Sequence, residues 1–158
     1  MESKRGDHNP KAEGEGVKRA PVMGGCLCGA VRFAITLPTK WCAHCHCSMC
    51  RRAHGAPYVT WVGVPSQSFR IVEGESRIVR YRSSEQATRS FCGTCGSPML
   101  FESTRWPGEV HVALGCVVGP IDQPPAGHVF FNSKADWVHV SDDLPRMGGS
   151  TGIEPLPG

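Results

Sequence analysis

The sequence predicts one mainly β domain made of antiparallel strands, and three observations support this fold class. Through the middle of the chain, apolar and polar residues alternate in short segments that end at Gly, Pro or Ser. Helical periodicity is nearly absent from the same region. A length of 158 residues with 40% apolar residues is also enough for one domain with its own hydrophobic core.

Each strand is predicted from its own run of alternating residues. In residues 30–36, Val31, Phe33 and Ile35 fall on one face and Arg32 falls on the other, which is typical of a half-buried strand. The same alternation predicts further strands, in chain order, at residues 58–64, 69–72, 77–82, 87–91, 98–102, 109–117 and 128–131. Because only short turns separate most of these runs, antiparallel pairing is expected.

Both ends of the chain are predicted to be tails outside the domain. Residues 1–21 are rich in Gly, Pro and charged residues and contain hardly an apolar side chain, so little burial would offset the entropy lost on ordering them. Residues 146–158 have a similar composition and are predicted to be a short C-terminal tail. The domain is therefore expected to span residues 22–145, with one helical turn at residues 50–55.

Composition and charge restrict the kinds of partner, such as a membrane or a nucleic acid, that the protein is expected to bind. No apolar run is long enough to cross a bilayer, and the first residues lack the hydrophobic centre of a secretory signal. A cytoplasmic protein with no membrane partner is therefore expected. The formal charge of +3 would fall to about zero if seven thiolates bound two zinc ions, so it does not indicate a nucleic-acid partner. The sequence leaves the oligomeric state open.

Seven of the nine cysteines lie in three close groups, which is the pattern of a metal-binding protein. Cys92 and Cys95 form a C-x-x-C knuckle with Gly after each thiol, and such a knuckle supplies two zinc ligands. A closed tetrahedral site needs two more ligands, and Cys26 with Cys28 is the second available pair. These four cysteines are predicted to form a structural zinc site.

The third group, Cys45, Cys47 and Cys50, places three thiols within six residues, too close together to pair as disulfides. Three protein ligands leave a fourth position for water or substrate, as in catalytic zinc sites. The alternative is that both sites are structural, with the fourth ligand of the second site supplied by Cys42, His44, His46 or His54.

The three groups also carry a resemblance to a known family. Residues 25–33, 45–51 and 91–96 read GCLCGAVRF, CHCSMCR and FCGTCG, and they resemble the signature of the glutathione-dependent formaldehyde-activating enzyme family, which also includes centromere protein V. The resemblance runs from about residue 24 to residue 144. It implies a β-tent fold of stacked antiparallel sheets with two zinc ions, one structural and one catalytic. The implied structural ligands are Cys26, Cys28, Cys92 and Cys95, and the implied catalytic ligands are Cys45, Cys47 and Cys50.

The activity implied by this resemblance joins formaldehyde to glutathione as S-(hydroxymethyl)glutathione, which is a carbon–sulfur lyase reaction run in reverse. The expected partners are a small thiol such as glutathione and a small aldehyde. We hypothesise that the thiol binds the open zinc position as a thiolate and attacks the carbonyl carbon. The alternative function is a non-catalytic zinc-binding scaffold for a protein or nucleic-acid partner, and a fourth protein ligand at the second zinc would favour it.

Further predictions concern single residues near the third cysteine group and the arginines farther along the chain. Arg51 is expected to grip a carboxylate of a glutathione-like ligand, and His54 is close enough in sequence to contact the same ligand. His46 is expected to point into solvent. Arg89, together with the arginines of residues 77–82, is expected to lie on a solvated sheet face.

Overall fold

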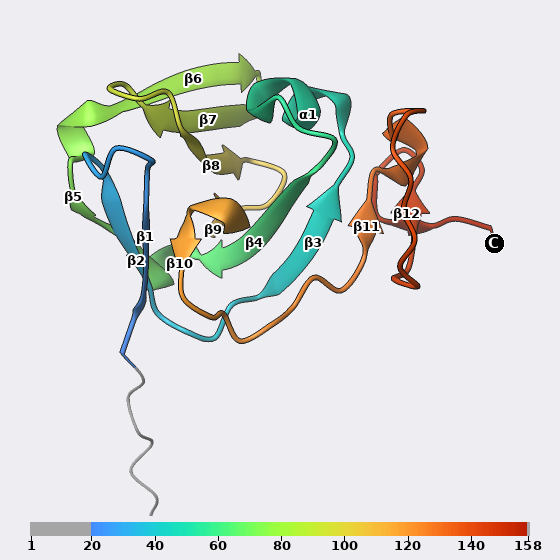
Figure 1. Ribbon diagram of the computed structural model, residues 1–158, viewed down its shortest axis with the longest axis horizontal. Coiled ribbons are helices and arrows are strands. Elements are labelled where there is room, and N and C mark those ends of the chain that lie inside the picture. Colours follow the sequence, from blue (N-terminus) through green and yellow to red (C-terminus); the bar gives the residue numbers. More distant parts are fainter. Residues whose placement is uncertain (1–19, 158) are drawn as a thin grey trace, which may run out of the picture.

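The computed structural model describes residues 20–157, and the strands in this range form a four-stranded sheet, a seven-stranded sheet and a two-stranded hairpin (Figure 1). The prediction of a mainly β domain with antiparallel sheets is confirmed. Of the predicted N-terminal tail, residues 1–19 lie outside the described residues.

The four-stranded sheet is antiparallel throughout and has the order β10-β1-β2-β5. Its strands are β1 (Val22–Gly25), β2 (Arg32–Ile35), β5 (Phe69–Glu73) and β10 (Val117–Val118). Short 3₁₀ helices, η1 (Ser66–Ser68) and η2 (Glu75–Arg77), precede and follow β5. Strand β1 was not predicted, because VMGG has too few residues to show an alternation.

The seven-stranded sheet has the order β11-β3-β4-β9-β8-β7-β6 and is antiparallel except for the pair β11–β3. Its strands are β3 (Trp41–Cys45), β4 (Val59–Pro65), β6 (Ile78–Ser84), β7 (Ala87–Cys92), β8 (Pro98–Ser103), β9 (Glu109–Ala113) and β11 (His128–Val129). The one α-helix in residues 20–157, α1 (Ser48–His54), connects β3 to β4. No helix in this range is long and apolar enough to cross a membrane.

The single strand predicted at residues 109–117 is divided in the structure. β9 ends at Ala113, a 3₁₀ helix, η3 (Leu114–Cys116), follows, and β10 then pairs with β1 in the other sheet. The sequence did not reveal the break, because both halves are apolar and alternation alone cannot tell which sheet a strand joins. The segment thus connects the two sheets.

Strand β4 is buried on both faces and separates two parts of the core. Val62 and Val64 point to the larger cluster, where they pack with Phe33 of β2 between the two sheets. Val59 and Trp61 point to the opposite side, into a smaller cluster that contains two of the cysteines of the third group. This division follows from the two-residue period of a strand. β4 therefore connects the main core directly to the candidate site.

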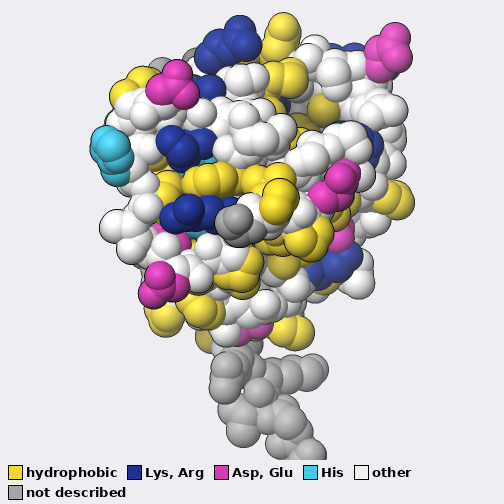
Figure 2. Space-filling model, turned by 90° about the vertical axis from the view of Figure 1, so that its right-hand side faces the viewer, with side chains coloured by type: hydrophobic (Ala, Val, Ile, Leu, Met, Phe, Trp, Pro, Cys, Tyr) yellow, Lys and Arg dark blue, Asp and Glu magenta, His cyan; other side chains and the backbone are white. Residues whose placement is uncertain are grey.

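The C-terminal segment packs along the edge of β3. β11 pairs with β3 in parallel, with His128 opposite His44, and a 3₁₀ helix, η4 (Phe131–Ser133), follows it. Residues 146–157, predicted as a tail, include a hairpin of β12 (Met147–Gly148) and β13 (Glu154–Pro155). Figure 2 views the side that carries β11 and β12 and shows a band of hydrophobic side chains beside Lys and Arg side chains. Packing against this segment covers an otherwise open strand edge.

A glycine in β4 allows Trp41 of β3 to lie flat across the sheet. A Cβ atom added at Gly63 would lie 2.3 Å from Cε2 and Nε1 of the Trp41 ring, and the same ring donates a hydrogen bond from Nε1 to Glu109 Oε2 at 3.1 Å. We expect Gly63→Ala to lower the free energy of unfolding by about 1–3 kcal/mol, because the ring must be displaced. Urea unfolding followed by tryptophan fluorescence measures this change.

The matched control is Gly115→Ala, because no heavy atom lies within 4 Å of a Cβ built at Gly115. Its effect should stay within about 1 kcal/mol in either direction. Equal effects of the two substitutions would show that the ring of Trp41 is not held in place by β4.

Candidate metal centre and active site

Four predicted zinc ligands, Cys26, Cys28, Cys92 and Cys95, come together in the structure, with Sγ atoms that all lie within 4.8 Å of one another. The Sγ atoms of Cys26 and Cys28 are 3.6 Å apart, and those of Cys28 and Cys92 are 3.9 Å apart. A tetrahedron with zinc–sulfur bonds of about 2.3 Å has sulfur–sulfur edges of about 3.8 Å. The donor set and its spacing therefore fit a zinc ion.

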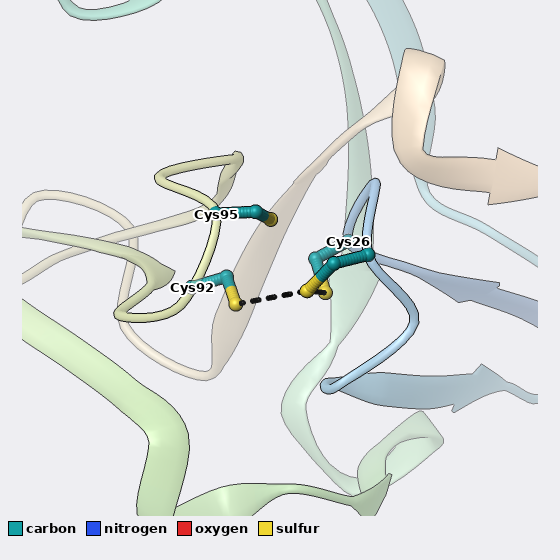
Figure 3. Close-up of side chains that lie close together, drawn as sticks. Cys26, Cys92 and Cys95 are labelled. Carbon is teal, nitrogen blue, oxygen red and sulfur yellow. Dashed lines mark hydrogen bonds between the residues drawn. The ribbon is translucent and has the colours of Figure 1, made fainter.

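This cluster joins the two sheets. Figure 3 shows Cys26, from the loop after β1, facing Cys92, the last residue of β7, and Cys95, from the turn that follows β7. Backbone N–H groups donate to the sulfurs, from Val31 to Cys26 Sγ at 3.2 Å and from Thr94 to Cys92 Sγ at 3.4 Å. Such donors stabilise thiolates, the form in which cysteine binds zinc.

The remaining three predicted ligands lie at the junction of β3 and α1. Cys45 ends the strand, Cys47 caps the helix, and Cys50 lies in its first turn. Cys45 and Cys50 are buried, and Cys47 is partly exposed. Within residues 20–157 only the first four cysteines form a group whose ligand atoms all lie within 4.8 Å of one another, so the second group is less tightly gathered.

The three thiols nevertheless interact. The pKa of Cys47 is lowered to about 2, chiefly by a hydrogen bond from the Cys45 thiol and then by one from Cys50. The pKa of Cys45 is raised, first by the same bond with Cys47. Negative charge therefore concentrates on Cys47, the most exposed of the three sulfurs.

Arg89 is a site residue that sequence reasoning missed. Its Nη2 donates to Cys50 Sγ at 3.6 Å, its guanidinium lies 4.9 Å from the ring centroid of Phe101, and its Nη1 is buried without a protein partner in the described chain. Arg89 pairs with Tyr81 in the register of β6 and β7. It therefore faces away from Arg80 and Arg82, contrary to the expectation of one solvated face.

Arg51 is placed differently from the expectation. Its Nε donates to the backbone oxygen of His46 at 3.2 Å, and its Nη2 donates to the backbone oxygen of Ser133 at 3.1 Å. These bonds connect helix α1 to η4. In this arrangement Arg51 supports the cysteine loop through protein contacts, whereas Arg89 is the cation in direct contact with a cysteine of the group.

The other candidate ligands of the second site have their own contacts. Cys42 is buried in the main core, and burial raises its pKa to about 11. The Nδ1 atom of His44 is hydrogen-bonded to Thr60 Oγ1 at 2.8 Å. His54 packs edge-on against Trp61, with ring centroids 5.2 Å apart.

His46 is fully buried, which corrects the expectation that it points into solvent. Its Nε2 lies 2.9 Å from His128 Nδ1, and His128 Nε2 lies 3.0 Å from Asp142 Oδ1. If both rings are neutral, His128 donates to the carboxylate and accepts from His46. The backbone N–H of His46 also donates to the oxygen of Val129 at 3.0 Å. The C-terminal segment thus fixes the residue between Cys45 and Cys47.

The lowered pKa of His54 predicts that the stability of the protein depends on pH. Burial, and secondarily the positive charge of Arg89, lower its pKa to about 4, against about 6.5 in an unfolded chain. Between these values the unfolded chain binds a proton that the folded chain does not, so stability should fall as the pH is lowered from about 6.5 to about 4.

Urea unfolding midpoints across this pH range, at matched zinc content, test the expectation. His54→Gln should lose less stability than the unchanged protein over the same range. The exposed His139 offers the control, since His139→Gln should retain the full pH dependence. Identical curves for the unchanged protein and His54→Gln would contradict the assignment.

A cavity of about 560 Å³ adjoins Cys45, Cys47 and Cys50. Arg89 lines it together with Trp41. Three interacting thiols, one guanidinium and a cavity of this size suit a metal-assisted reaction on a small molecule.

Comparison with known proteins agrees with this arrangement. The model of the family described as glutathione-dependent formaldehyde-activating enzyme matches residues 21–133. A Halomonas elongata protein with that provisional name is 30% identical over 127 residues, which cover 75% of this chain and 80% of that protein. An uncharacterized lyase of Schizosaccharomyces pombe is 30% identical over 81 residues, which cover 51% of this chain and 57% of that protein. A solved structure of a Rhodobacter sphaeroides protein matches with a TM-score of 0.54 and 27% identity, covering 63% of this chain and 91% of that one.

Proposed function

The protein belongs to the glutathione-dependent formaldehyde-activating enzyme family, and we propose that it is a zinc-dependent lyase-type enzyme that makes or breaks a carbon–sulfur bond between a small thiol and a small aldehyde. The observation that carries this proposal is the set of three interacting thiols at a cavity, with Arg89 donating to one of them. The names of the two relatives point in the same direction.

The two cysteine groups would hold different zinc ions. Cys26, Cys28, Cys92 and Cys95 supply four ligands and so complete a structural site. Cys45, Cys47 and Cys50 would hold the second ion. A zinc ion there would lower the pKa of a substrate thiol, so that its sulfur is anionic at neutral pH.

Arg89 supplies the positive charge that the proposed reaction needs beside the cysteine group. Nη2 of Arg89 donates to Cys50 Sγ, and Arg89 lines the cavity. When the thiolate forms its bond to the carbonyl carbon, the carbonyl oxygen gains the negative charge that the sulfur loses. The positive charge of the Arg89 guanidinium beside the site suits that oxygen. The proton released by the thiol goes to solvent, and the oxygen takes one from solvent.

His46 has a supporting role in this proposal. Its side chain is bound to His128 and its backbone to Val129 and Arg51. These contacts hold the loop between Cys45 and Cys47 in one conformation, and a fixed ligand geometry favours catalysis over mere binding.

Exchange NMR of glutathione with formaldehyde, with and without zinc-loaded protein, tests the proposal. Faster exchange between free and adduct forms, in proportion to zinc at the second site, is the expected result. Exchange at the uncatalysed rate, with both zinc sites filled, would overturn the activity on this pair and favour the alternative of a zinc-binding scaffold.

A further inference from the structure

The cavity at Cys45, Cys47 and Cys50 has an aromatic side. Trp41, Trp61, Phe101, Trp106 and Phe130 line it, and polar side chains that include Ser83, Ser84, Gln86 and Ser103 line another part of the cavity. The ring centroid of Phe101 lies 6.0 Å from that of Trp61 and 6.1 Å from that of Trp106. Trp61, Phe101 and Trp106 therefore form one continuous aromatic surface, which is called the aromatic wall below.

A histidine lies beside this wall. His111 is buried, burial lowers its pKa, and its Nε2 lies 3.2 Å from Glu109 Oε2. Its ring lies 4.7 Å from that of Trp41 and 5.2 Å from that of Trp106. The ring of His111 thus connects Trp41 to the aromatic wall.

Apart from the cysteine group, the charged side chains in the lining have one sign. Among the cavity-lining residues of the described chain are Arg89 and Arg105, but no Asp, Glu or Lys. Glutathione carries two carboxylates, which an arginine can pair with, and one ammonium group, which would lose its hydration here without a carboxylate partner. The ammonium end of a glutathione-like thiol therefore fits poorly inside this cavity.

Formaldehyde also fits it poorly, for a different reason. It adds only two non-hydrogen atoms to a thiol, so most of the volume of about 560 Å³ would remain as water against aromatic rings. Filling an aromatic-lined cavity with an apolar group releases that water and is favourable.

We propose that the cavity receives the aldehyde-derived part of the adduct, and that the substrates of this enzyme are aromatic or branched aliphatic aldehydes, whose apolar group packs against Trp61, Phe101 and Trp106. This inference rests on the proposed function, since it names the aldehyde class of the same reaction. The thiol part remains toward solvent, with its sulfur at the cysteine group. As in the reaction of the proposed function, the thiolate sulfur bonds to the carbonyl carbon, and the thiol proton and the proton taken up by the oxygen are exchanged with solvent.

Binding of stable thioethers tests the cavity without any turnover. S-Benzylglutathione carries an aromatic group on sulfur, whereas S-methylglutathione has only a group of formaldehyde size. Calorimetric titration of the zinc-loaded protein should give at least about tenfold tighter binding of the benzyl compound. Equal affinity, or tighter binding of the methyl compound, would overturn the inference.

Kinetics with one thiol and two aldehydes give the second test. With glutathione, exchange NMR should give a kcat/KM for phenylacetaldehyde at least about tenfold above that for formaldehyde. Trp106→Ala should reduce this ratio at least about fivefold, because it removes part of the wall. The matched control is Trp137→Ala, since Trp137 is 68% exposed and does not line the cavity. The ratio of the two kcat/KM values should be unchanged in this variant.

The two proposals fail separately. Preferred binding of S-benzylglutathione without exchange of any aldehyde would overturn the lyase function and leave the recognition of an apolar group standing. Fast exchange with formaldehyde, no gain with phenylacetaldehyde and equal binding of both thioethers would overturn the inference and leave the lyase function standing.

Discussion

Cys47→Ser is expected to reduce thiol–aldehyde exchange by the zinc-loaded protein at least about a hundredfold, since even residues that only hydrogen-bond to a metal ligand contribute about ten- to a hundredfold. We expect Cys47 to be the most sensitive position, because it is partly exposed beside the cavity whereas Cys45 and Cys50 are buried. A serine hydroxyl stays protonated at neutral pH and is a poor zinc ligand. Exchange NMR measures the rate, and zinc analysis should show that one equivalent is lost.

The fold of the Cys47→Ser protein should be unchanged, because Cys47 is partly exposed and packs only against the edge of the smaller core cluster. Its circular dichroism spectrum should therefore match that of the unchanged protein. Cys42→Ala is the control variant, since Cys42 belongs to the main core, and it should retain both zinc equivalents. If Cys42→Ala instead released the second zinc, Cys42 would be the fourth ligand and the site would be closed. Full activity of Cys47→Ser would contradict the catalytic assignment.

Cys92→Ser is expected to have the largest effect on stability. Cys92 is fully buried, and its group ties the loop after β1 to the turn between β7 and β8. Structural zinc contributes about 10–16 kcal/mol of apparent binding energy in zinc-finger peptides, so loss of one ligand should cost at least about 3 kcal/mol here. A drop in Tm of roughly 10 °C follows for a chain of this size. Calorimetry and a colorimetric zinc-release assay measure the two effects.

The control for this variant is Cys116→Ser. The thiol of Cys116 contacts the backbone oxygen of Pro98 at 3.6 Å and belongs to neither cysteine group. A hydroxyl can donate to the same oxygen, so zinc content should stay constant and Tm should change little. If Cys92→Ser retained its zinc and its Tm, the four-cysteine cluster would not be a structural metal site.

Local sequence patterns were sufficient for most strands and for the first zinc site. Alternation over residues 30–36 located β2, and the spacing of Cys92 and Cys95 identified a knuckle that needed a second pair. Both signals are short-range, because side chains alternate along a strand and two zinc ligands fit one tight turn. The same patterns failed at the strand predicted for residues 109–117, where η3 carries the chain from one sheet to the other.

The surroundings of the second cysteine group could be learned only from the folded chain. His128, which is itself bonded to Asp142, contacts His46 from 82 residues away because β11 pairs in parallel with β3, and no local pattern encodes that pairing. Arg89 reaches Cys50 because the register of β6 and β7 turns it away from the neighbouring arginines. The types of metal ligand and their spacing can be read directly from the amino-acid sequence. The charge, burial and cavity around them arise from contacts between distant strands, which tertiary packing alone brings together.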